Sequence, residues 1–350
     1  MARKFVKING VVQHYVWGGT DFIPSLLNIE NKEAKPFAEY WLGAHPNHPS
    51  PIHNSKQNLH SAIEQNKMEM LGATVAAQFN SLPFLLKILD VAQMLSIQVH
   101  PSKESAAKGF ENENEKDISL TAPHRNYKDQ NHKPEALVAL SDFWLLHGFK
   151  NENQIRLLLY NISEFNFLLP LFETGGYKSL YQKVMTMPQQ HVNDMLQPII
   201  NRIVPLYKLN KLKKSSEDFW AARAAVHFCK NEIIDRGIFS IYFFNLLHLK
   251  KGQAIYQPEG LPHAYLEGKN VEVMANSDNV LRAGLTNKHI DVAELMKHIL
   301  FEATVPRVIQ AMENEHQQFK FFRRSFKLLV FIFRSLYYPR HRSFKKYMLH

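Results

Sequence analysis

The feature that most constrains the fold is a change in the period of the hydrophobic residues about 150 residues into the chain. From about residue 150 to 235 apolar side chains recur at roughly helical spacing, whereas the segments on both sides are typical of strands and turns. The helical spacing covers residues 152–160, 177–186, 190–206 and 217–236, and the strand-like segments include 6–17, 82–100, 136–149 and 238–255. This order predicts a mainly β fold, a sandwich or barrel, with a helical domain inserted into it.

Positive charge is concentrated at the end of the chain. The 350 residues include 42 Lys and Arg against 32 Asp and Glu, a formal charge of +10. Residues 320–350 hold nine of the basic residues and no acidic one, so the first 319 residues carry a net charge of +1. A nearly neutral body without a helix-turn-helix, RNA-binding or zinc-finger pattern is not expected to bind nucleic acid.

Cysteine count and hydropathy narrow the class of protein further. The single cysteine, Cys229, excludes an intramolecular disulfide framework and a cysteine-rich zinc site. The longest strongly apolar run, residues 328–333, is far shorter than the roughly 20 residues of a membrane-spanning helix. Because the first 12 residues contain no apolar signal region, we expect a cytoplasmic protein.

A strand-like segment around residue 98 presents the first side chains that could bind a metal ion. Residues two apart in a strand point to the same side, so Ser96, Gln98 and His100 would share one face. Ile97 and Val99 would then face the opposite layer. Taken alone, such a segment is also typical of a polar strand edge.

Two later segments add ligands of the same chemical type. In His132-Lys133-Pro134-Glu135 an extended chain would place Lys133 and Glu135 on one face and His132 on the other. His263 follows a Gly/Pro turn, with Tyr265 on its face. Together the three segments supply two imidazoles, a carboxylate and a neutral amide, which suit zinc or another divalent transition metal at the mouth of a β-barrel.

Several short segments of the sequence, in the same order along the chain, resemble the type I mannose-6-phosphate isomerase family, the zinc-dependent isomerases of the cupin superfamily. The matching segments lie at residues 15–18 (Tyr-Val-Trp-Gly), 38–46, 82–89, 95–101, 127–129, 132–135, 261–268 and 271–286. The resemblance extends from residue 1 to about 318. It implies a cupin-type jelly-roll barrel, with residues 1–150 and 237–318 as two parts of a catalytic domain, residues 151–236 as a helical insertion, and residues 319–350 as an atypical tail.

The resemblance also implies a metal site and a set of residues around the substrate. The zinc ligands carry over to Gln98, His100, Glu135 and His263, for one zinc ion per chain. The catalytic residues carry over to Arg282, Lys133, His132, Glu272 and Asp278, and the substrate-binding residues to Lys87, Ser96, Tyr265 and Lys288. The implied enzyme is a cytoplasmic monomer of mannose metabolism that acts on a sugar phosphate, in the direction of mannose breakdown or of GDP-mannose synthesis.

The implied reaction converts mannose 6-phosphate and fructose 6-phosphate into each other by moving a proton between carbons 2 and 1 through a cis-enediolate. A divalent cation stabilises the charge that develops on the neighbouring oxygen. The sequence leaves the base open among His132, Lys133, Glu272, Asp278 and a zinc-bound hydroxide. Arg282 suits the phosphate or the developing oxyanion, because a guanidinium binds such groups through two parallel hydrogen bonds.

The chain departs from the family pattern at three places. Asn287 and Gln253 replace the usual Pro and Glu in two turns. Members of the family continue past position 320 with further strands, whereas residues 320–350 contain nine aromatics and no Gly, Asp or Glu. The C-terminal cupin layer is therefore expected to be missing or replaced, which leaves open a truncated, inactive or crippled relative whose tail arises from a shifted reading frame.

Two further alternatives remain at the level of sequence. A cupin oxygenase would use His100, Glu135 and His263 as a facial triad for iron, although Gln98 and a basic pocket argue against it. In the tail, apolar residues at 322, 326, 329, 333 and 336 alternate with Arg and Lys, as in a helix that touches an acidic membrane surface. The competing interpretation is a poorly packed extension prone to aggregation.

Overall fold

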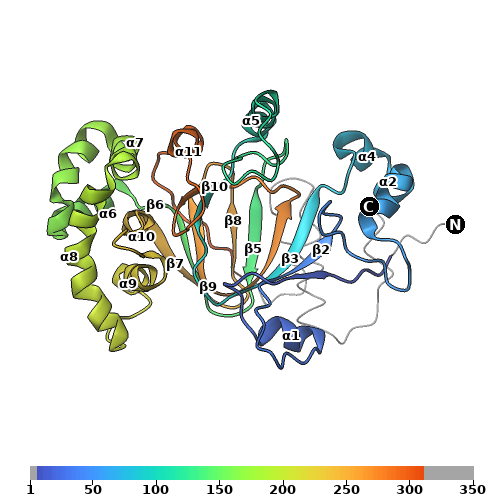
Figure 1. The fold of residues 1–350 in the computed structure, drawn as a ribbon, viewed down its shortest axis with the longest axis horizontal. Coiled ribbons are helices and arrows are strands. Elements are labelled where there is room, and N and C mark those ends of the chain that lie inside the picture. Colours follow the sequence, from blue (N-terminus) through green and yellow to red (C-terminus); the bar gives the residue numbers. More distant parts are fainter. Residues whose placement is uncertain (1–5, 311–350) are drawn as a thin grey trace. The chain divides into compact units, whose positions relative to one another are not determined.

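The computed structural model describes residues 6–310, and these form a two-layered antiparallel β structure with a block of helices against one layer (Figure 1). Every pairing between named strands is antiparallel, and the strands share one long member, β9. The first layer runs in the order β1 (Val11–Gln13), β2 (Glu39–Gly43), β3 (Phe84–Val91), β9 (His263–Ala275), β5 (Glu135–Ala139), β8 (Ala254–Gln257). The second runs β10 (Leu281–Gly284), β4 (Ile97–Val99), β9, β6 (Phe143–Phe149), β7 (Phe244–Leu249).

Strand β9 belongs to both layers because its direction changes in the middle. Its first residues pair with β4 and β6, and its later residues pair with β3 and β5. At the change lies Gly268, whose φ of +125° is rarely adopted by other residues and whose added Cβ would stand 2.4 Å from the carbonyl oxygen of Asp142. Glycine therefore allows one strand to carry residues of both layers toward a common interior.

The helical block leaves the second layer after β6 and returns to it at β7, its hydrogen-bonded neighbour. It consists of α6 (Glu152–Asn161), η1 (Ser163–Leu168), α7 (Leu169–Thr186), α8 (Gln189–Lys208), α9 (Glu217–Phe228) and α10 (Gly237–Phe243). Its first helix begins at a capping box, in which the Asn151 side chain accepts from the Gln154 N–H at 2.9 Å and the Gln154 side chain accepts from the Asn151 N–H at 3.1 Å.

Shorter helices surround the strands elsewhere. They are α1 (Phe22–Leu27), α2 (Leu59–Gln65), α3 (Lys67–Leu71), α4 (Ala73–Phe79), α5 (Lys103–Glu115) and α11 (Val292–His298). Within residues 6–310 no helix has the length and hydropathy needed to cross a membrane.

The second layer separates two interiors of different composition. On its outer face Ile97, Val99, Leu281 and Ala283 join the apolar core of the helical block. Its inner face, with the first layer, encloses a smaller apolar cluster that includes Leu145. The inner face also carries the polar residues described in the next subsection, so the alternation of strand side chains separates packing from chemistry.

The expected architecture, mainly β with an inserted helical block, is confirmed, but three details of the prediction are wrong. Residues 238–243, the start of a segment expected to be strand, lie in α10, in which all seven residues are buried; a short apolar run of this kind does not distinguish a buried helix from a buried strand. Helix α9 ends at Phe228 instead of continuing to 236. Ile97 and Val99 pack on the helical block and not on the opposite β layer.

The predictions for the C-terminal tail lie outside the described residues. These are the atypical segment 319–350, the missing or replaced cupin layer, and the amphipathic helix that touches a membrane surface. The structure leaves all three as predictions.

Candidate functional site

A row of polar side chains crosses the inner face of the second layer. His147 on β6 is paired with His263 on β9, His263 with Gln98 on β4, and Gln98 with Arg282 on β10. Directly opposed residues of antiparallel strands project to the same side, so all four face the interior between the layers. A sheet that alternates apolar and polar residues thus presents imidazole, amide and guanidinium groups side by side.

His100, Glu135 and His263 converge at this row. The His100 Nε2 and His263 Nε2 atoms lie 3.3 Å from the two carboxylate oxygens of Glu135, one to each. The two imidazole rings have centroids 5.2 Å apart, and all three side chains are buried. Their ligating atoms fall within 4.8 Å of one another, which is close enough for a single metal ion.

Backbone carbonyls fix the orientation of both imidazoles. His100 Nδ1 donates to the carbonyl oxygen of Asn279 at 2.8 Å, and His263 Nδ1 donates to that of Leu261 at 2.9 Å. A proton on Nδ1 leaves a lone pair on Nε2, and neither Nε2 atom has a hydrogen-bond partner within residues 6–310. Two orphaned nitrogens and a carboxylate that face one another fit a metal ion.

The protonation states of the cluster favour metal binding as well. Burial and the charge of Lys133 lower the pKa of His100 to about 4, so its imidazole is neutral near pH 7. Although burial alone would raise the pKa of Glu135, Lys133 and His100 hold it well below its usual range. Lys133 Nζ lies 3.2 Å from Glu135 Oε1. The cluster therefore offers the neutral imidazole of His100 and the carboxylate of Glu135 beside the Nε2 atom of His263.

A second group of charged residues lies in the first layer. Lys87 on β3 is paired with Glu272 on β9; its Nζ lies 3.5 Å from Glu39 Oε2 and 4.5 Å from the ring centroid of Trp41. The Tyr265 hydroxyl donates to Glu272 at 2.6 Å. Burial and the charge of Glu135 raise the pKa of Glu272 to about 7, although Lys87 and Lys133 act in the opposite direction. Glu272 is thus a buried carboxyl group that can exchange a proton near neutral pH.

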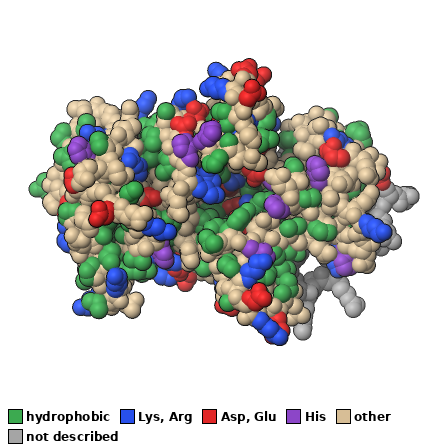
Figure 2. All heavy atoms as spheres, viewed as in Figure 1, with side chains coloured by type: hydrophobic (Ala, Val, Ile, Leu, Met, Phe, Trp, Pro, Cys, Tyr) green, Lys and Arg blue, Asp and Glu red, His purple; other side chains and the backbone are tan. Residues whose placement is uncertain are grey.

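Cationic side chains form a third group at the β10 edge. Neither the Arg282 nor the Lys288 side chain has an ion pair within residues 6–310, and burial lowers the pKa of both. The charge of Arg282 lowers the pKa of Lys288 further. Figure 2 shows basic side chains gathered in the hollow at the centre of this face of the molecule. Cations without carboxylate partners are free to bind an anionic group.

Three of the expected site residues, His132, Asp278 and Ser96, form no hydrogen bond or ion pair with His100, Glu135 or His263 within residues 6–310, and two of them pair with other residues. His132 Nδ1 lies 3.0 Å from Glu259 Oε2, on a partly exposed pair. Asp278 accepts from His45 Nε2 at 3.2 Å, and this contact lowers the pKa of Asp278 against the effect of burial. Ser96 is half-buried just before β4.

Sequence reasoning did not single out Asn279, which holds the loops of the site together. The Asn279 Oδ1 atom accepts from the backbone of Lys128 at 2.7 Å and of Asp129 at 3.2 Å. Its Nδ2 donates to the carbonyl oxygens of Asp129 and Asn131, each at 2.8 Å. It is fully buried. A signal was available in the run Asn-Ser-Asp-Asn at 276–279, because such residues commonly bond to nearby backbone.

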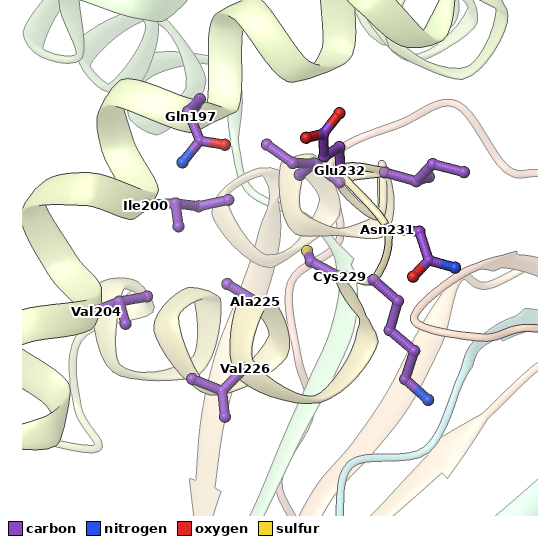
Figure 3. A pocket seen from close by; sticks show the side chains of 11 residues that line it. Gln197, Ile200, Val204, Ala225, Val226, Cys229, Asn231 and Glu232 are labelled. Atoms are coloured by element: carbon purple, nitrogen blue, oxygen red, sulfur yellow. The ribbon is translucent and has the colours of Figure 1, made fainter.

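A separate pocket of about 270 Å³ lies in the helical block (Figure 3). Gln197, Ile200 and Val204 of α8 line one side, and Ala225 and Val226 of α9 another. Its walls are mainly apolar and bring no imidazole near a carboxylate. The chemistry of the molecule is therefore assigned to the interior between the β layers.

Comparisons with known proteins agree with this assignment. A family model described as phosphomannose isomerase type I, catalytic domain, matches residues 5–152. The mannose-6-phosphate isomerase of Escherichia coli is 36% identical over 307 residues, which cover 85% of this chain and 75% of the relative. The Homo sapiens protein of the same name is 36% identical over 328 residues, with coverages of 86% and 74%.

Solved structures give the same result for the fold. The crystal structure of mannose 6-phosphate isomerase from Salmonella typhimurium bound to substrate, fructose 6-phosphate, and zinc superposes with a TM-score of 0.75 at 36% identity. The superposition covers 86% of this chain and 76% of that one. A zinc-bound structure without substrate named in its description superposes with a TM-score of 0.74.

Proposed function

The chain belongs to the type I phosphomannose isomerase family, and from this premise we propose how its residues divide the work of the zinc-dependent interconversion of mannose 6-phosphate and fructose 6-phosphate. His100, Glu135 and His263 hold the metal, with Gln98 as the fourth ligand. The observation that carries this proposal is the pair of buried Nε2 atoms that face Glu135 without a hydrogen-bond partner among the described residues. A zinc ion held by these residues would supply positive charge that polarises the sugar oxygen and stabilises the enediolate.

Gln98 supports this proposal through its position and its lack of charge. It lies between His263 and Arg282 in the sheet, so its amide oxygen faces the same interior as the imidazoles. With Glu135 as the single anionic ligand, the site retains a net positive charge, which keeps it a strong Lewis acid.

We propose Arg282 and Lys288 as the ligands of the phosphate group. Arg282 is partly buried and Lys288 is exposed, and neither is neutralised by a carboxylate within the described range. Ser96 and Lys87 complete the contacts to the sugar. A phosphate at the β10 edge would place the sugar carbons along the row toward Gln98 and His263.

Glu272 is the best candidate for the base that moves the proton. A general base works best when its pKa is close to the working pH, and that of Glu272 is raised to about 7. The competing groups have partners of their own: Lys133 pairs with Glu135, Asp278 with His45, and His132 with Glu259. Tyr265 orients the Glu272 carboxyl group through its hydroxyl.

The organisation of the chain completes the proposal. Residues 1–150 and 237–318 would form one catalytic domain and residues 151–236 an insertion, since β6 and β7 on either side of the helices pair with each other. We propose a monomer, with the active site built from a single chain, that acts in the cytoplasm. Light scattering on the purified protein tests the monomer.

The decisive experiment is a coupled isomerase assay on the full chain, with metal analysis of the same sample. We expect about one zinc per chain, loss of activity with a chelator and recovery with zinc. Glu135→Gln should lose both metal and activity, whereas Glu30→Gln, on an exposed pair with Lys32, should keep both. Full turnover by metal-free protein would refute the proposal, and iron after aerobic purification would favour the oxygenase alternative.

A further inference from the structure

Asp235 lies between the helical block and the cationic edge of the site and bonds to the backbone of both. It belongs to the segment that joins α9 to α10, and the same segment lines the pocket of Figure 3 through residues 229–234. Asp235 Oδ1 accepts from the N–H of Gly237 at 2.7 Å and of Leu285 at 2.8 Å, and Oδ2 accepts from the N–H of Thr286 at 3.1 Å. One carboxylate therefore gathers three backbone donors from two distant parts of the chain.

The turn that Asp235 holds has an unusual backbone. Leu285 has a φ of +54°, in the left-handed region that side chains other than Gly, Asn and Asp rarely adopt. Two glycines meet beside it: a Cβ at Gly237 would stand 2.7 Å from the Leu285 nitrogen, and a Cβ at Gly284 would stand 2.4 Å from the Gly237 Cα. Successive N–H groups of Leu285 and Thr286 both point to the Asp235 carboxylate, which offsets the strain at Leu285.

The turn lies between the two cations of the proposed phosphate site. Arg282 comes two residues before Gly284, and Lys288 comes two residues after Thr286. The Thr286 Oγ1 atom accepts from the Lys288 backbone at 3.1 Å, which continues the ordered structure to Lys288. The direction of the turn therefore decides whether both cations can reach one anion.

The helical block anchors the other side of Asp235. Gln189 Nε2 donates to the carbonyl oxygen of Ile234 at 2.9 Å, and the Arg236 guanidinium donates to the carbonyl oxygens of Met185 and Met187. The residues before and after Asp235 are thus bound to α7 and α8 or to the link between them. The helical block thus fixes the position of Asp235, and Asp235 in turn fixes the turn at residues 284–286.

We propose that Asp235 is a positioning residue for phosphate recognition, which ties the turn at 284–286 to the helical block so that Arg282 and Lys288 converge on one phosphate. This inference rests on the function proposed above. The Asp235 carboxylate accepts its hydrogen bonds from backbone N–H groups and forms no ion pair with Arg282 within residues 6–310. It therefore orders the cations without neutralising them, as a direct carboxylate–guanidinium pair would.

The test compares Asp235→Asn with wild type and with Asp194→Asn, a matched control in which an exposed Asp accepts from Gln190 on α8. The amide keeps the shape of Asp235 but turns an N–H₂ toward backbone N–H groups. We expect the KM for mannose 6-phosphate and the inhibition constant of inorganic phosphate to rise about tenfold, which corresponds to about 1.4 kcal/mol. Bound zinc should be unchanged and kcat should stay within about twofold.

A double-mutant cycle separates positioning from general stabilisation. If Asp235 acts through Arg282, the effect of Asp235→Asn on phosphate inhibition should largely disappear in an Arg282→Ala background. Should Asp235→Asn fail to fold, Asp235→Glu takes its place, because it keeps the charge and displaces it by one methylene. We expect Asp235→Glu to raise the KM and the inhibition constant of inorganic phosphate by a smaller factor.

The outcomes distinguish this inference from the proposed function. Three results would overturn the positioning role while wild type remained an isomerase. They are unchanged phosphate inhibition in Asp235→Asn, an equal loss of kcat and of bound zinc in that variant, and full additivity of its effect with that of Arg282→Ala. Wild-type protein that neither isomerises the sugar phosphate nor binds inorganic phosphate would overturn the proposed function, and this inference with it.

Discussion

The interior between the β layers and the interior of the helical block differ in what they bury. Between the layers lie charged and ionisable groups: Lys87, His100, Glu135, His263 and Glu272. The helical block buries mainly apolar side chains, among them Leu159, Leu180, Trp220 and Phe239, which are fully enclosed. Ionisable groups cost free energy to bury, whereas apolar groups gain it. The comparison teaches that one region holds the chemistry and the other supplies much of the stability.

The two regions meet at the second β layer, where one strand serves both. In β4, Ile97 and Val99 pack on the helices while Gln98 faces the site. Because the two faces of a strand are independent to first order, changes on one face should alter activity and changes on the other should alter stability. The following predictions test that separation.

The largest effect is expected at the ligand cluster. Glu135→Gln removes the one anionic ligand of the proposed metal site, so we expect a loss of at least about 1,000-fold in kcat/KM, equivalent to roughly 4 kcal/mol. Metal-free Glu135→Gln should also unfold at a lower urea concentration than metal-free wild type, because the buried Lys133 loses its carboxylate partner. Full kcat/KM in the folded variant would break the separation.

The next effect is expected in the helical block. Leu180→Ala in α7 removes a fully buried side chain and should lower the free energy of unfolding by about 2–5 kcal/mol. Urea titration measures the loss, and kcat per folded molecule should remain unchanged. Leu157→Ala on α6, where the side chain is 61% exposed, is the control and should change stability by less than about 0.5 kcal/mol.

A smaller effect concerns pH and the stability of the metal-free protein. The pKa of Glu272 rises from 4.5 to about 7 on folding, so the folded state binds more protons than the unfolded state between these values. The contribution of Glu272 to the free energy of unfolding is therefore fully present at low pH and is lost as the pH rises from 4.5 to about 7. Glu272→Gln should remove this decline, measured as the difference between urea midpoints at pH 5 and pH 8 in the presence of chelator.

An equal decline in Glu272→Gln and in wild type would show that another group titrates, and would remove the reason to regard Glu272 as the base. Tyr265→Phe is the companion variant. It deletes the hydroxyl that donates to Glu272 and should raise the pKa of that carboxyl group further.

The smallest effect is expected at the surface of the helical block. Arg156→Ala removes an exposed pair with Glu152, one turn earlier on α6, with a nitrogen–oxygen distance of 3.2 Å. Such pairs contribute about 0.3–0.5 kcal/mol and are weakened by salt. Thermal unfolding at low and high ionic strength should show a small difference that salt removes, with no change in activity.

Much of the β framework could be predicted from sequence, because alternation and helical spacing report which face of each element is buried. The same reasoning brought Gln98 and His100 to one face and grouped them with Glu135 and His263. It did not identify α10, since residues 237–243 are buried on every side and carry no periodic signal. Periodicity reports a difference between faces, and α10 has none.

The supporting residues were harder to predict for a different reason. Asn279 and Asp235 act on backbone groups of segments distant in sequence, and any residue can supply a backbone N–H. Nothing in the partner's side chain indicates such a bond. Only the fold, which brings residue 235 next to residues 285 and 286, makes these bonds visible.

The central place of β9 has a consequence for how the protein is made. Strands β3, β4, β5 and β6 all pair with β9, yet each is synthesised before it. Until His263 leaves the ribosome, these strands have open edges that invite pairing with other chains, and Gln98, His100 and Glu135 lack the fourth proposed metal ligand. Closing the two layers and completing the proposed metal cluster therefore both depend on the synthesis of a single strand.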